Sequence, residues 1–584
     1  MKVLLISSPA RTYAPNLDMP TGIMWLAAWL EKHGYQVEIL DGARLREAPE
    51  KLAERARQAQ ADLIGISGII TSYAYIISLS HALKKNMPET PIVLGAQVVI
   101  NNLINCFKHM AIDYAISGYG EIPLLKLVRF LEGDGSLNEI PGLTYRDGRH
   151  IVSVPGREYV KDVNELPIPA YHHIDMEYYI SVNGPTEVFD KYRRVTGKTA
   201  PEWRMAKIKG TLGCTDRCSF CVHEQEFVGL KRFSIDYLRK HIRHLRERYN
   251  INVLNIGEEM FITTLKNIKP FNELMVNEFP EIFWTGNTRA NHVTKNIIQE
   301  LEKGNCYQVA WGFESGSQRM LDLMQKRISR EQNIDAFVNA DRSSIGCSMT
   351  FMVGNVGETD STMKETVAAI RESKMPKGGV FFAQPYPGGR TWDWAVEKGL
   401  IEDTHAYLLK AADKDASNFV INMTPYPKWV LSFWQRQLFA AFQRNALPLL
   451  RRNLSLCETP GERKALIKET IISTIRGWLP HKIPFFLHHL VTKIYCGVFD
   501  LRARFFPTDR DRQYAFEIDS KNAICPSQLL VSRPQRYLAP DQLREVLSSG
   551  VNRASLDSKE NPFIDGVHAR LVFGEEKVNQ PSGE

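Results

Sequence analysis

Short apolar runs alternate with amphipathic segments along the first 135 residues of the chain. The runs at 2–6, 36–40, 62–67, 91–95 and 113–117 are typical of parallel strands buried on both faces. Segments such as 22–33 and 73–86 have the apolar spacing of helices, and Gly34 marks the end of the first one. This order predicts a doubly wound, Rossmann-like α/β domain over residues 1–135.

Small residues gather where these predicted strands end. In doubly wound sheets, ligands bind at the carboxyl ends of the strands, and small side chains let a large flat ligand approach the backbone. The candidates at this edge are Ser7, Ser8, Ser67, Gly68, Gly95, Gly118 and Gly120.

A second alternating pattern follows a Pro-rich stretch, which we expect to form a hairpin and linker over 136–204. Six strand-like segments within 205–400, most of them preceded by a helical one, predict a partial or full β/α barrel. Barrel chemistry lies at the carboxyl ends of the strands. We expect 401–545 to be mainly helical, 546–584 to be a polar tail, and the last thirty or so residues to lack order.

Positive charge is concentrated near the C-terminus. The whole chain carries a formal charge of +7, whereas residues 428–512 contain 15 Lys and Arg against 6 Asp and Glu. Trp and Phe lie among these cations, a combination that suits an anionic membrane surface or an amphiphilic substrate. A helical cap that packs on the barrel explains the pattern equally well. We rank nucleic acid below a membrane surface or an amphiphilic substrate as the partner, because the chain shows no nucleic-acid-binding module.

Hydropathy argues against a membrane-spanning or secreted protein. The chain has no apolar run of about 18 residues, and its first apolar run is shorter than the core of a signal peptide. Nine mostly scattered cysteines do not resemble a disulfide framework. We expect a cytoplasmic protein, with peripheral membrane contact through 428–512 as a second expectation.

Three of the nine cysteines form a cluster. Cys214, Cys218 and Cys221 have the spacing C-x3-C-x2-C directly after a predicted strand. Three thiolates suit a 4Fe-4S cluster whose fourth iron has no protein ligand. The spacing leaves two alternatives open, namely a zinc site completed by His223 and cysteines without a metal.

The triplet with Phe220 in its aromatic position resembles the motif of the radical S-adenosylmethionine (radical SAM) superfamily. This resemblance implies that S-adenosylmethionine binds the open iron and is cleaved reductively to a 5′-deoxyadenosyl radical. Further segments resemble the strand-end motifs of the same family. The second-strand segment departs from the family's usual acidic motif, so either Glu258 or Glu259 is the candidate to bind the amino group of the cosubstrate. The S-adenosylmethionine-binding residues implied are Phe220, Glu258, Glu259, Arg289, Glu314, Ser315, Gly354, Gly357 and Glu358.

Other roles remain open for several of these residues. Glu358 stands at the start of a predicted helix, where a carboxylate is also favourable as a cap. Arg289 and Glu314 are also consistent with solvated surface side chains.

The first domain resembles the cobalamin-binding domain that precedes many radical SAM domains, so the likeness covers about residues 1–400. It implies that the small strand-end residues named above contact cobalamin, and it adds Ala96, Gln97 and Glu121 to them. Neither of the family's histidine positions for the lower face of cobalt is occupied by histidine here, which implies base-off cobalamin. A degenerate domain without cofactor is the alternative, because fold does not fix function.

The subgroup contains class B methyltransferase-like and anaerobic tetrapyrrole cyclase-like enzymes. The resemblance implies methylation of an unactivated carbon in a small molecule, with a lipid-like or tetrapyrrole compound weakly favoured as the substrate. Radical cyclisation or rearrangement is the alternative within the family, and a non-catalytic iron–sulfur or cobalamin sensor is the alternative outside it. A reductase, flavodoxin or ferredoxin is expected to supply the electron.

Overall fold

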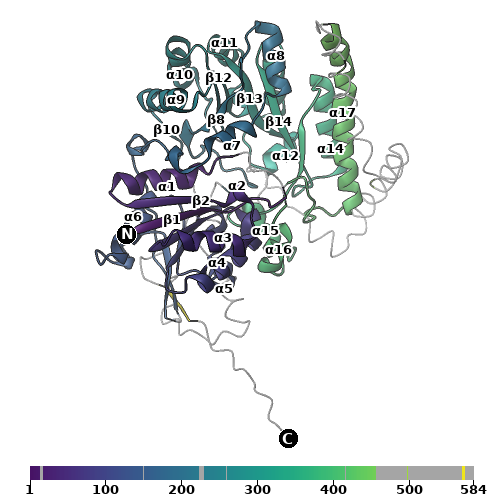
Figure 1. The fold of residues 1–584 in the computed structure, drawn as a ribbon. Coiled ribbons are helices and arrows are strands. Elements are labelled where there is room, and N and C mark those ends of the chain that lie inside the picture. The colour runs from purple at the N-terminus through teal and green to yellow at the C-terminus, as the bar shows by residue number, and fades with distance from the viewer. Residues whose placement is uncertain are drawn as a thin grey trace. The chain divides into compact units, whose positions relative to one another are not determined.

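The computed structural model describes residues 1–13, 18–148, 150–222, 229–257, 260–414 and 416–455, together with Lys464, Cys496 and Ala569–Val572. The chain divides into two compact units (Figure 1). The first contains Met1–Glu177, Glu402–Asp415 and Val531–Glu584, and the second contains Tyr178–Ile401 and Ala416–Leu530. The expected domain boundaries stay predictions.

The first unit is built on a sheet whose five leading strands are parallel. Their spatial order is β2-β1-β3-β4-β5, with chain reversal at β1 as in doubly wound folds. The strands are β1 (Lys2–Ser7), β2 (Gln36–Asp41), β3 (Leu63–Ser67), β4 (Ile92–Gly95) and β5 (Tyr114–Ile116). Most residues of β1, β3 and β4 are apolar and buried, which confirms the fold class expected from the apolar runs.

Helices connect these strands. They are α1 (Thr21–Lys32), α3 (Pro49–Gln58), α4 (Tyr73–Asn86), α5 (Leu103–His109) and α6 (Glu121–Leu131), with the four-residue α2 (Gly42–Leu45) after β2. Helix α16 (Thr404–Ala411) returns to this unit from late in the chain and packs against α4. A hydrogen bond from the Asn105 side chain to Thr404 Oγ1 (3.0 Å) ties it to α5.

Three antiparallel strands extend the sheet beyond β5. A hairpin of β6 (Leu143–Asp147) and β7 (His150–Ser153) is followed in space by β16 (Ala569–Val572). In β16, Ala569 lies opposite Ser153 and Val572 opposite His150. The expectation that the last thirty or so residues lack order is therefore wrong for these four, whose backbone groups pair with an edge strand.

The second unit contains a six-stranded parallel sheet in the order β15-β14-β13-β12-β11-β8. A strand order that follows the chain order is that of a partial β/α barrel, so the barrel is partial rather than full. Its strands are β8 (Met205–Ile208), β11 (Val253–Ile256), β12 (Phe283–Asn287), β13 (Cys306–Glu314), β14 (Gly346–Val353) and β15 (Gly379–Phe382).

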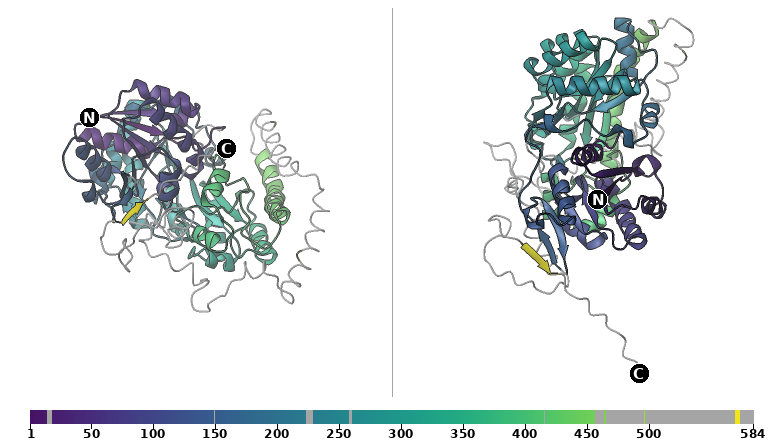
Figure 2. Two further views of the ribbon diagram at one scale, coloured as in Figure 1. Left: turned by 90° about the horizontal axis from the view of Figure 1, so that it is seen from below. Right: turned by 60° about the vertical axis from the view of Figure 1, so that its left-hand side comes forward.

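Helices between successive strands cover this sheet. They are α9 (Ile235–Tyr249), α10 (Leu265–Glu278), α11 (Lys295–Lys303), α13 (Arg330–Asp341) and α14 (Asp360–Ser373), with the shorter α12 (Gln318–Leu323) after β13 and α15 (Arg390–Glu397) after β15. Helices α9, α10 and α11 lie together on one side of the sheet (Figures 1 and 2).

Aromatic side chains seal the amino ends of the strands in the second unit. Phe189 and Tyr192 of α8 (Glu187–Thr196) form a buried cluster with Val253, Phe283 and Tyr307, which begin β11 and β12 and lie near the start of β13. The rings meet edge to face, at centroid distances such as 5.2 Å for Phe189 and Phe283. Closure at this end leaves the carboxyl ends of the strands for the site.

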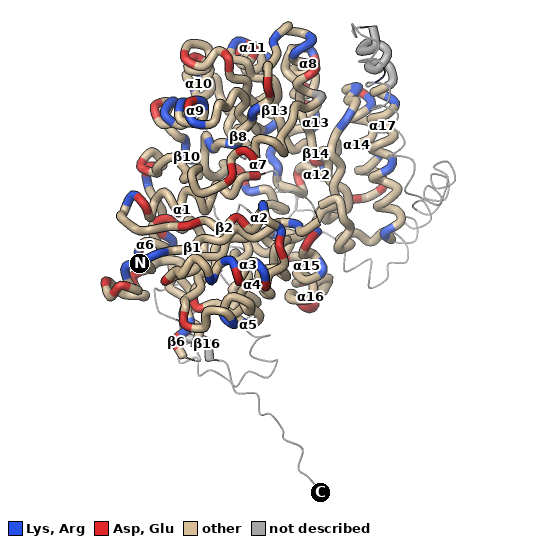
Figure 3. Tube along the Cα trace, in the orientation of Figure 1, with Lys and Arg blue, Asp and Glu red and all other residues tan. Residues whose placement is uncertain are grey.

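Apart from Lys464 and Cys496, the basic C-terminal region is described only up to α17 (Lys428–Ser455), which packs on α14 and β15. Figure 3 shows Lys and Arg at intervals along this helix. Trp434 is fully buried and its indole N–H donates to Asp360 (3.2 Å), so one face of α17 is a packing surface, as the helical-cap alternative expects. Among the described residues, none of the helices combines the length and the hydropathy that a membrane-spanning segment requires. The remainder of the basic region lies outside the described residues.

Candidate functional site

The three cysteines lie on one loop at the carboxyl edge of the half-barrel, directly after β9 (Thr211–Leu212). Gly213 opens the loop with a φ of +79°, and a Cβ there would lie 2.3 Å from the Gly229 carbonyl oxygen. Glycine is therefore required at this turn. Further along, Ser219 N–H donates to the Met324 carbonyl (2.9 Å), which fixes the middle of the loop.

The chemistry of the loop fits an iron–sulfur cluster. Cys214, Cys218 and Cys221 form no disulfide, and Cys218 is buried. Burial raises the pKa of Cys214, so metal binding must displace a proton that the apo-protein retains. Phe220 packs on a cluster formed by Met320, Leu323 and Met324, so the aromatic residue of the motif anchors the loop to α12. His223, the fourth zinc ligand considered above, lies outside the described residues.

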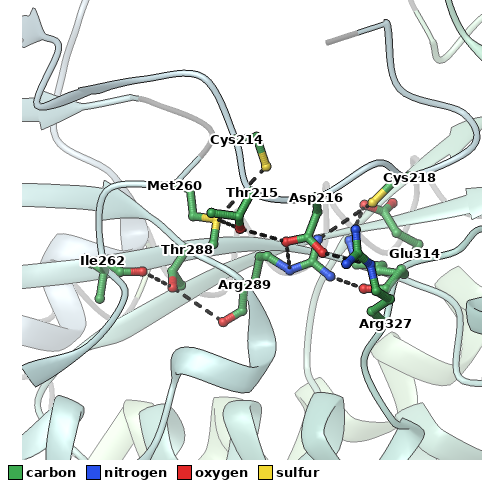
Figure 4. Close-up of polar contacts among 11 residues, drawn as sticks. Cys214, Thr215, Asp216, Cys218, Met260, Ile262, Thr288, Arg289, Glu314 and Arg327 are labelled. Atoms are coloured by element: carbon green, nitrogen blue, oxygen red, sulfur yellow. Dashed lines mark hydrogen bonds and ion pairs between the residues drawn. The ribbon is translucent and has the colours of Figure 1, made fainter. Parts of the chain in front are cut away.

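Arg289, which follows β12, connects the cysteine loop to the strand ends (Figure 4). Its Nη1 lies 3.6 Å from Cys218 Sγ, its Nε lies 3.2 Å from Asp216 Oδ2, and its Nη2 donates to the Lys326 carbonyl. The residue is only 7% exposed. Arg327 also contacts Asp216, at 3.5 Å. The Arg289 guanidinium therefore holds the cysteine loop through these contacts. The alternative that Arg289 is a solvated surface side chain is wrong.

Glu314 ends β13 and forms a buried ion pair with Lys326. The Lys326 ammonium lies 3.0 Å from Glu314 Oε1, and both side chains are at most 10% exposed. Glu314 has a φ of +59°, an uncommon conformation for a residue with a side chain. A Cβ at Gly312 would overlap Glu314 Oε1 at 1.8 Å, so Gly312 provides the space for this carboxylate. Glu314 is not a solvated surface glutamate.

The neighbouring Ser315 contributes to packing. It is fully buried, shares a 3.0 Å hydrogen bond with the Thr366 hydroxyl and accepts from the Ser317 N–H (3.1 Å). These contacts connect the end of β13 to α14. A role of Ser315 in S-adenosylmethionine binding stays a prediction.

The segment after β14 holds a buried carboxyl group. Gly354 and Gly357 have φ values of +83° and +79°, and Glu358 Oε2 accepts the Gly354 N–H at 2.5 Å. Burial raises the pKa of Glu358 to about 8, and its Oε1 has no hydrogen-bond partner among the described residues. Thr359, in a capping box with Thr362, caps α14, so the expectation that Glu358 caps this helix is wrong.

Sequence reasoning missed Asp216, Lys326, Arg327 and Met260 as members of the site. Met260 Sδ lies 4.0 Å from Cys214 Sγ and accepts from the Thr215 hydroxyl (3.4 Å). The position of Asp216 between two of the clustered cysteines is the one signal that the sequence offered. Glu258 and Glu259, the candidates for the second-strand motif, lie outside the described residues.

The first unit has its own candidate edge, at the carboxyl ends of β1, β3, β4 and β5. The predicted small residues fall there, since Ser7, Ser67 and Gly95 end their strands. Ser7 donates to Asp41 (2.7 Å), whereas the buried hydroxyls of Ser8 and Ser117 have no partner in the described part of the chain. The buried, unpartnered hydroxyls fit a polar ligand at this edge.

The other predicted residues of this edge lie beside it. Of the residues that the structure describes, a Cβ at Gly95 would meet only the Ile116 carbonyl oxygen, at 4.0 Å, so the space at the end of β4 is open. Ala96 has a φ of +68°, a conformation that favours glycine. A Cβ at Gly68 would contact the side chains of Ser8 and Ile76. The remaining candidates are Gln97 in η2 (Gln97–Val99), Gly118 with a φ of +101°, Gly120 before α6, and the buried Glu121.

Family models match both units. The model described as B12 binding domain matches residues 13–128, and the model described as Radical SAM superfamily matches residues 208–370. The chain is a radical SAM enzyme with a B12-binding domain. The cofactors implied are a 4Fe-4S cluster, S-adenosylmethionine and cobalamin, and the three clustered cysteines and the open β4 edge fit the first and the last of these.

Two curated relatives and one solved structure illustrate the likeness. An uncharacterized methyltransferase of Pyrococcus horikoshii is 24% identical over 408 residues, which are 69% of this chain and 84% of that protein. An anaerobic magnesium-protoporphyrin IX monomethyl ester cyclase of Cereibacter sphaeroides is 25% identical over 59% of this chain and 55% of that protein. The radical S-adenosylmethionine methyltransferase TsrM of Kitasatospora setae has a TM-score of 0.55 at 16% identity, over 68% of this chain and 75% of that chain.

Proposed function

We propose that this radical SAM enzyme uses cobalamin to methylate an unactivated carbon of a small-molecule substrate. The observation that carries the proposal is the presence, in one chain, of a three-cysteine loop and of a separate sheet edge where the buried hydroxyls of Ser8 and Ser117 have no partner among the described residues. The methyltransferase name of the Pyrococcus relative supports it. When bound, the cluster supplies an electron to S-adenosylmethionine and cobalamin carries the methyl group.

The residues of the second unit have distinct proposed roles. Cys214, Cys218 and Cys221 hold the cluster. Arg289 and Asp216 fix the loop that carries these thiolates, so Arg289 positions the cluster rather than binding the cosubstrate carboxylate. Glu314 and Lys326 already pair at the strand end, and an incoming zwitterion can exchange with this pair, its ammonium facing Glu314 and its carboxylate facing Lys326.

In the first unit, Ser8 and Ser117 are the proposed donors to cobalamin, with Gly95 leaving space for the flat ring. Neither the Ala96 nor the Gln97 side chain can ligate cobalt as histidine does, so base-off binding stays part of the proposal. The strained Ala96 backbone is maintained by the surrounding sheet edge.

The test is cofactor-dependent cleavage of S-adenosylmethionine by the anaerobically reconstituted protein, with and without cobalamin. We expect 5′-deoxyadenosine in both preparations and S-adenosylhomocysteine only with cobalamin. Cys218→Ala should abolish the 5′-deoxyadenosine. Cleavage that persists in Cys218→Ala would contradict the assignment of the cluster ligands.

Radical cyclisation without methylation is the second candidate, favoured by the match to the Cereibacter cyclase. It predicts 5′-deoxyadenosine without S-adenosylhomocysteine, whether or not cobalamin is supplied. Formation of S-adenosylhomocysteine that requires cobalamin would exclude this candidate as the main reaction.

A further inference from the structure

A group of two histidines and a glutamate lies in the first unit, away from the residues assigned above. Glu31 is in the last turn of α1, and His172 and His173 are in η5 (Tyr171–His173). Glu31 Oε1 lies 3.1 Å from His172 Nε2 and 2.7 Å from His173 Nε2. All three ligand atoms lie within 4.8 Å of one another.

We propose that Glu31, His172 and His173 bind one zinc ion. Two imidazole nitrogens and one carboxylate oxygen form a ligand set that zinc commonly uses. Tetrahedral zinc at bond lengths of about 2.0–2.1 Å places its ligand atoms about 3.3 Å apart. The two imidazole nitrogens, now 3.1 and 2.7 Å from Glu31 Oε1, therefore need to move away from that oxygen by about 0.2 and 0.6 Å.

The local contacts of Glu31 favour a cation at this position. Its contacts are to the two imidazoles, and no Lys or Arg pairs with it in the described part of the chain. The adjacent Lys32 is directed elsewhere, because its ammonium donates to the Glu165 carbonyl (2.8 Å) and lies over the Trp29 ring. Zinc would replace the shared protons between Glu31 and the two rings with a divalent charge.

The two ligand-bearing segments are held together independently of the proposed metal. Ala170 N–H donates to the Met24 carbonyl (3.1 Å), and Trp25 Nε1 donates to the Pro167 carbonyl (3.1 Å). Ala170 and Tyr171 are almost fully buried, so the backbone before His172 is fixed against α1. A site that is largely preformed loses little conformational entropy when the ion binds.

The exposure of the three side chains shows that solvent can reach the fourth coordination position of the ion. The His172 side chain is 57% exposed, that of Glu31 32% and that of His173 18%. Water can therefore complete the tetrahedron, and the ion can enter directly from solvent. The bound zinc would cross-link α1 to the segment that leads out of the first unit. This inference does not rest on the proposed methyl transfer.

The test is zinc binding by the full chain with its iron–sulfur cluster reconstituted, so that the cysteines are occupied. Equilibrium dialysis should find one zinc per chain, with affinity reduced at least tenfold in Glu31→Ala and in His173→Ala. His81→Ala is the matched control, because His81 lies in α4 of the same unit and its ring contacts the His109 carbonyl. Unchanged zinc affinity in both site variants would overturn the proposal.

Cobalt(II) provides a second measurement that separates these ligands from the cysteines. We expect ligand-field bands without a thiolate-to-cobalt charge-transfer band, and we expect those bands to be lost in His173→Ala. Glu31→Gln, which keeps the side-chain shape, guards against misfolding and should also weaken binding. Cobalt spectra that are identical in the wild type, Glu31→Gln and His173→Ala would refute the site.

Discussion

Replacement of Arg289 by glutamine tests the electrostatic role of the cysteine loop. The guanidinium Nη1 lies 3.6 Å from Cys218 Sγ inside a buried site. The reduction potential of an iron–sulfur cluster depends on nearby charge and on hydrogen bonds to its sulfurs. Arg289→Gln removes a positive charge and leaves Asp216, so the cluster should become harder to reduce.

The expected magnitude follows from the distance. A unit charge 3.6 Å from Sγ, at an effective dielectric constant of about 20, interacts by about 4–5 kcal/mol with a full charge on that sulfur. For a one-electron couple this energy corresponds to about 200 mV. Because the added electron is shared over the whole cluster, we expect about half of that value, a shift of about 100 mV to more negative potential.

The assay is a redox titration of the reconstituted protein, followed by electron paramagnetic resonance of the reduced cluster. Arg289→Lys is the charge-preserving control and should shift the potential by less than half as much. Asp216→Asn removes the opposite charge and should move the potential in the positive direction. Iron content measured on each variant separates a shifted potential from a lost cluster.

The sign of these shifts decides the outcome. A change in Arg289→Gln smaller than about 20 mV would mean that the site is solvated well enough to screen the guanidinium. A shift of the same sign in Arg289→Gln and Asp216→Asn would refute the electrostatic reasoning outright.

Three further substitutions have expected results. The pKa of about 8 for buried Glu358, against an ordinary 4.5, means that its contribution to stability is complete below pH 4.5 and lost as pH rises to about 8. In the wild type, the free energy of unfolding measured with urea should fall by up to about 4 kcal/mol between pH 5 and pH 9 for this reason. Glu358→Gln should not show this fall. Gly213→Ala should prevent cluster assembly, measured as iron per chain, because its Cβ would meet the Gly229 carbonyl oxygen. Gly34→Ala is the control, because Gly34 also has a positive φ but a Cβ there would have nothing within 4 Å. Gly95→Leu should lower cobalamin binding at least tenfold without changing iron content, and unchanged cobalamin content would contradict the assigned edge.

Both sheets could be predicted because buried parallel strands are nearly continuous apolar runs. The apolar pattern does not predict helix α3, since its sequence is mostly polar and the helix buries only Leu52, Ala53 and Ala56. Helix α8 lies within the segment expected to be hairpin and linker, because its aromatic residues pack against strand ends that are distant in sequence. Tertiary packing of this kind is not encoded in local periodicity.

The cysteine loop could be predicted from spacing, whereas the charges around it could not. Lys326 lies twelve residues after Glu314, and Arg289 lies in a different strand-end segment from Cys218. Their contacts exist because parallel strands deliver their carboxyl ends to one edge. The Glu31–histidine group was not expected either, because its members are about 140 residues apart in sequence and meet only through the packing of η5 on α1.

The charges at the cysteine loop explain why a positive side chain is retained in a buried place. Arg289 and Lys326 are buried and pair with the carboxylates of Asp216 and Glu314, whereas Arg327, which also contacts Asp216, is 62% exposed. An oxidised 4Fe-4S core with three thiolates carries one net negative charge, and the Arg289 guanidinium lies beside one of those thiolates, Cys218. Reduction adds a second negative charge. The field of Arg289 then favours the reduced state, which is the state that must transfer an electron to the cosubstrate.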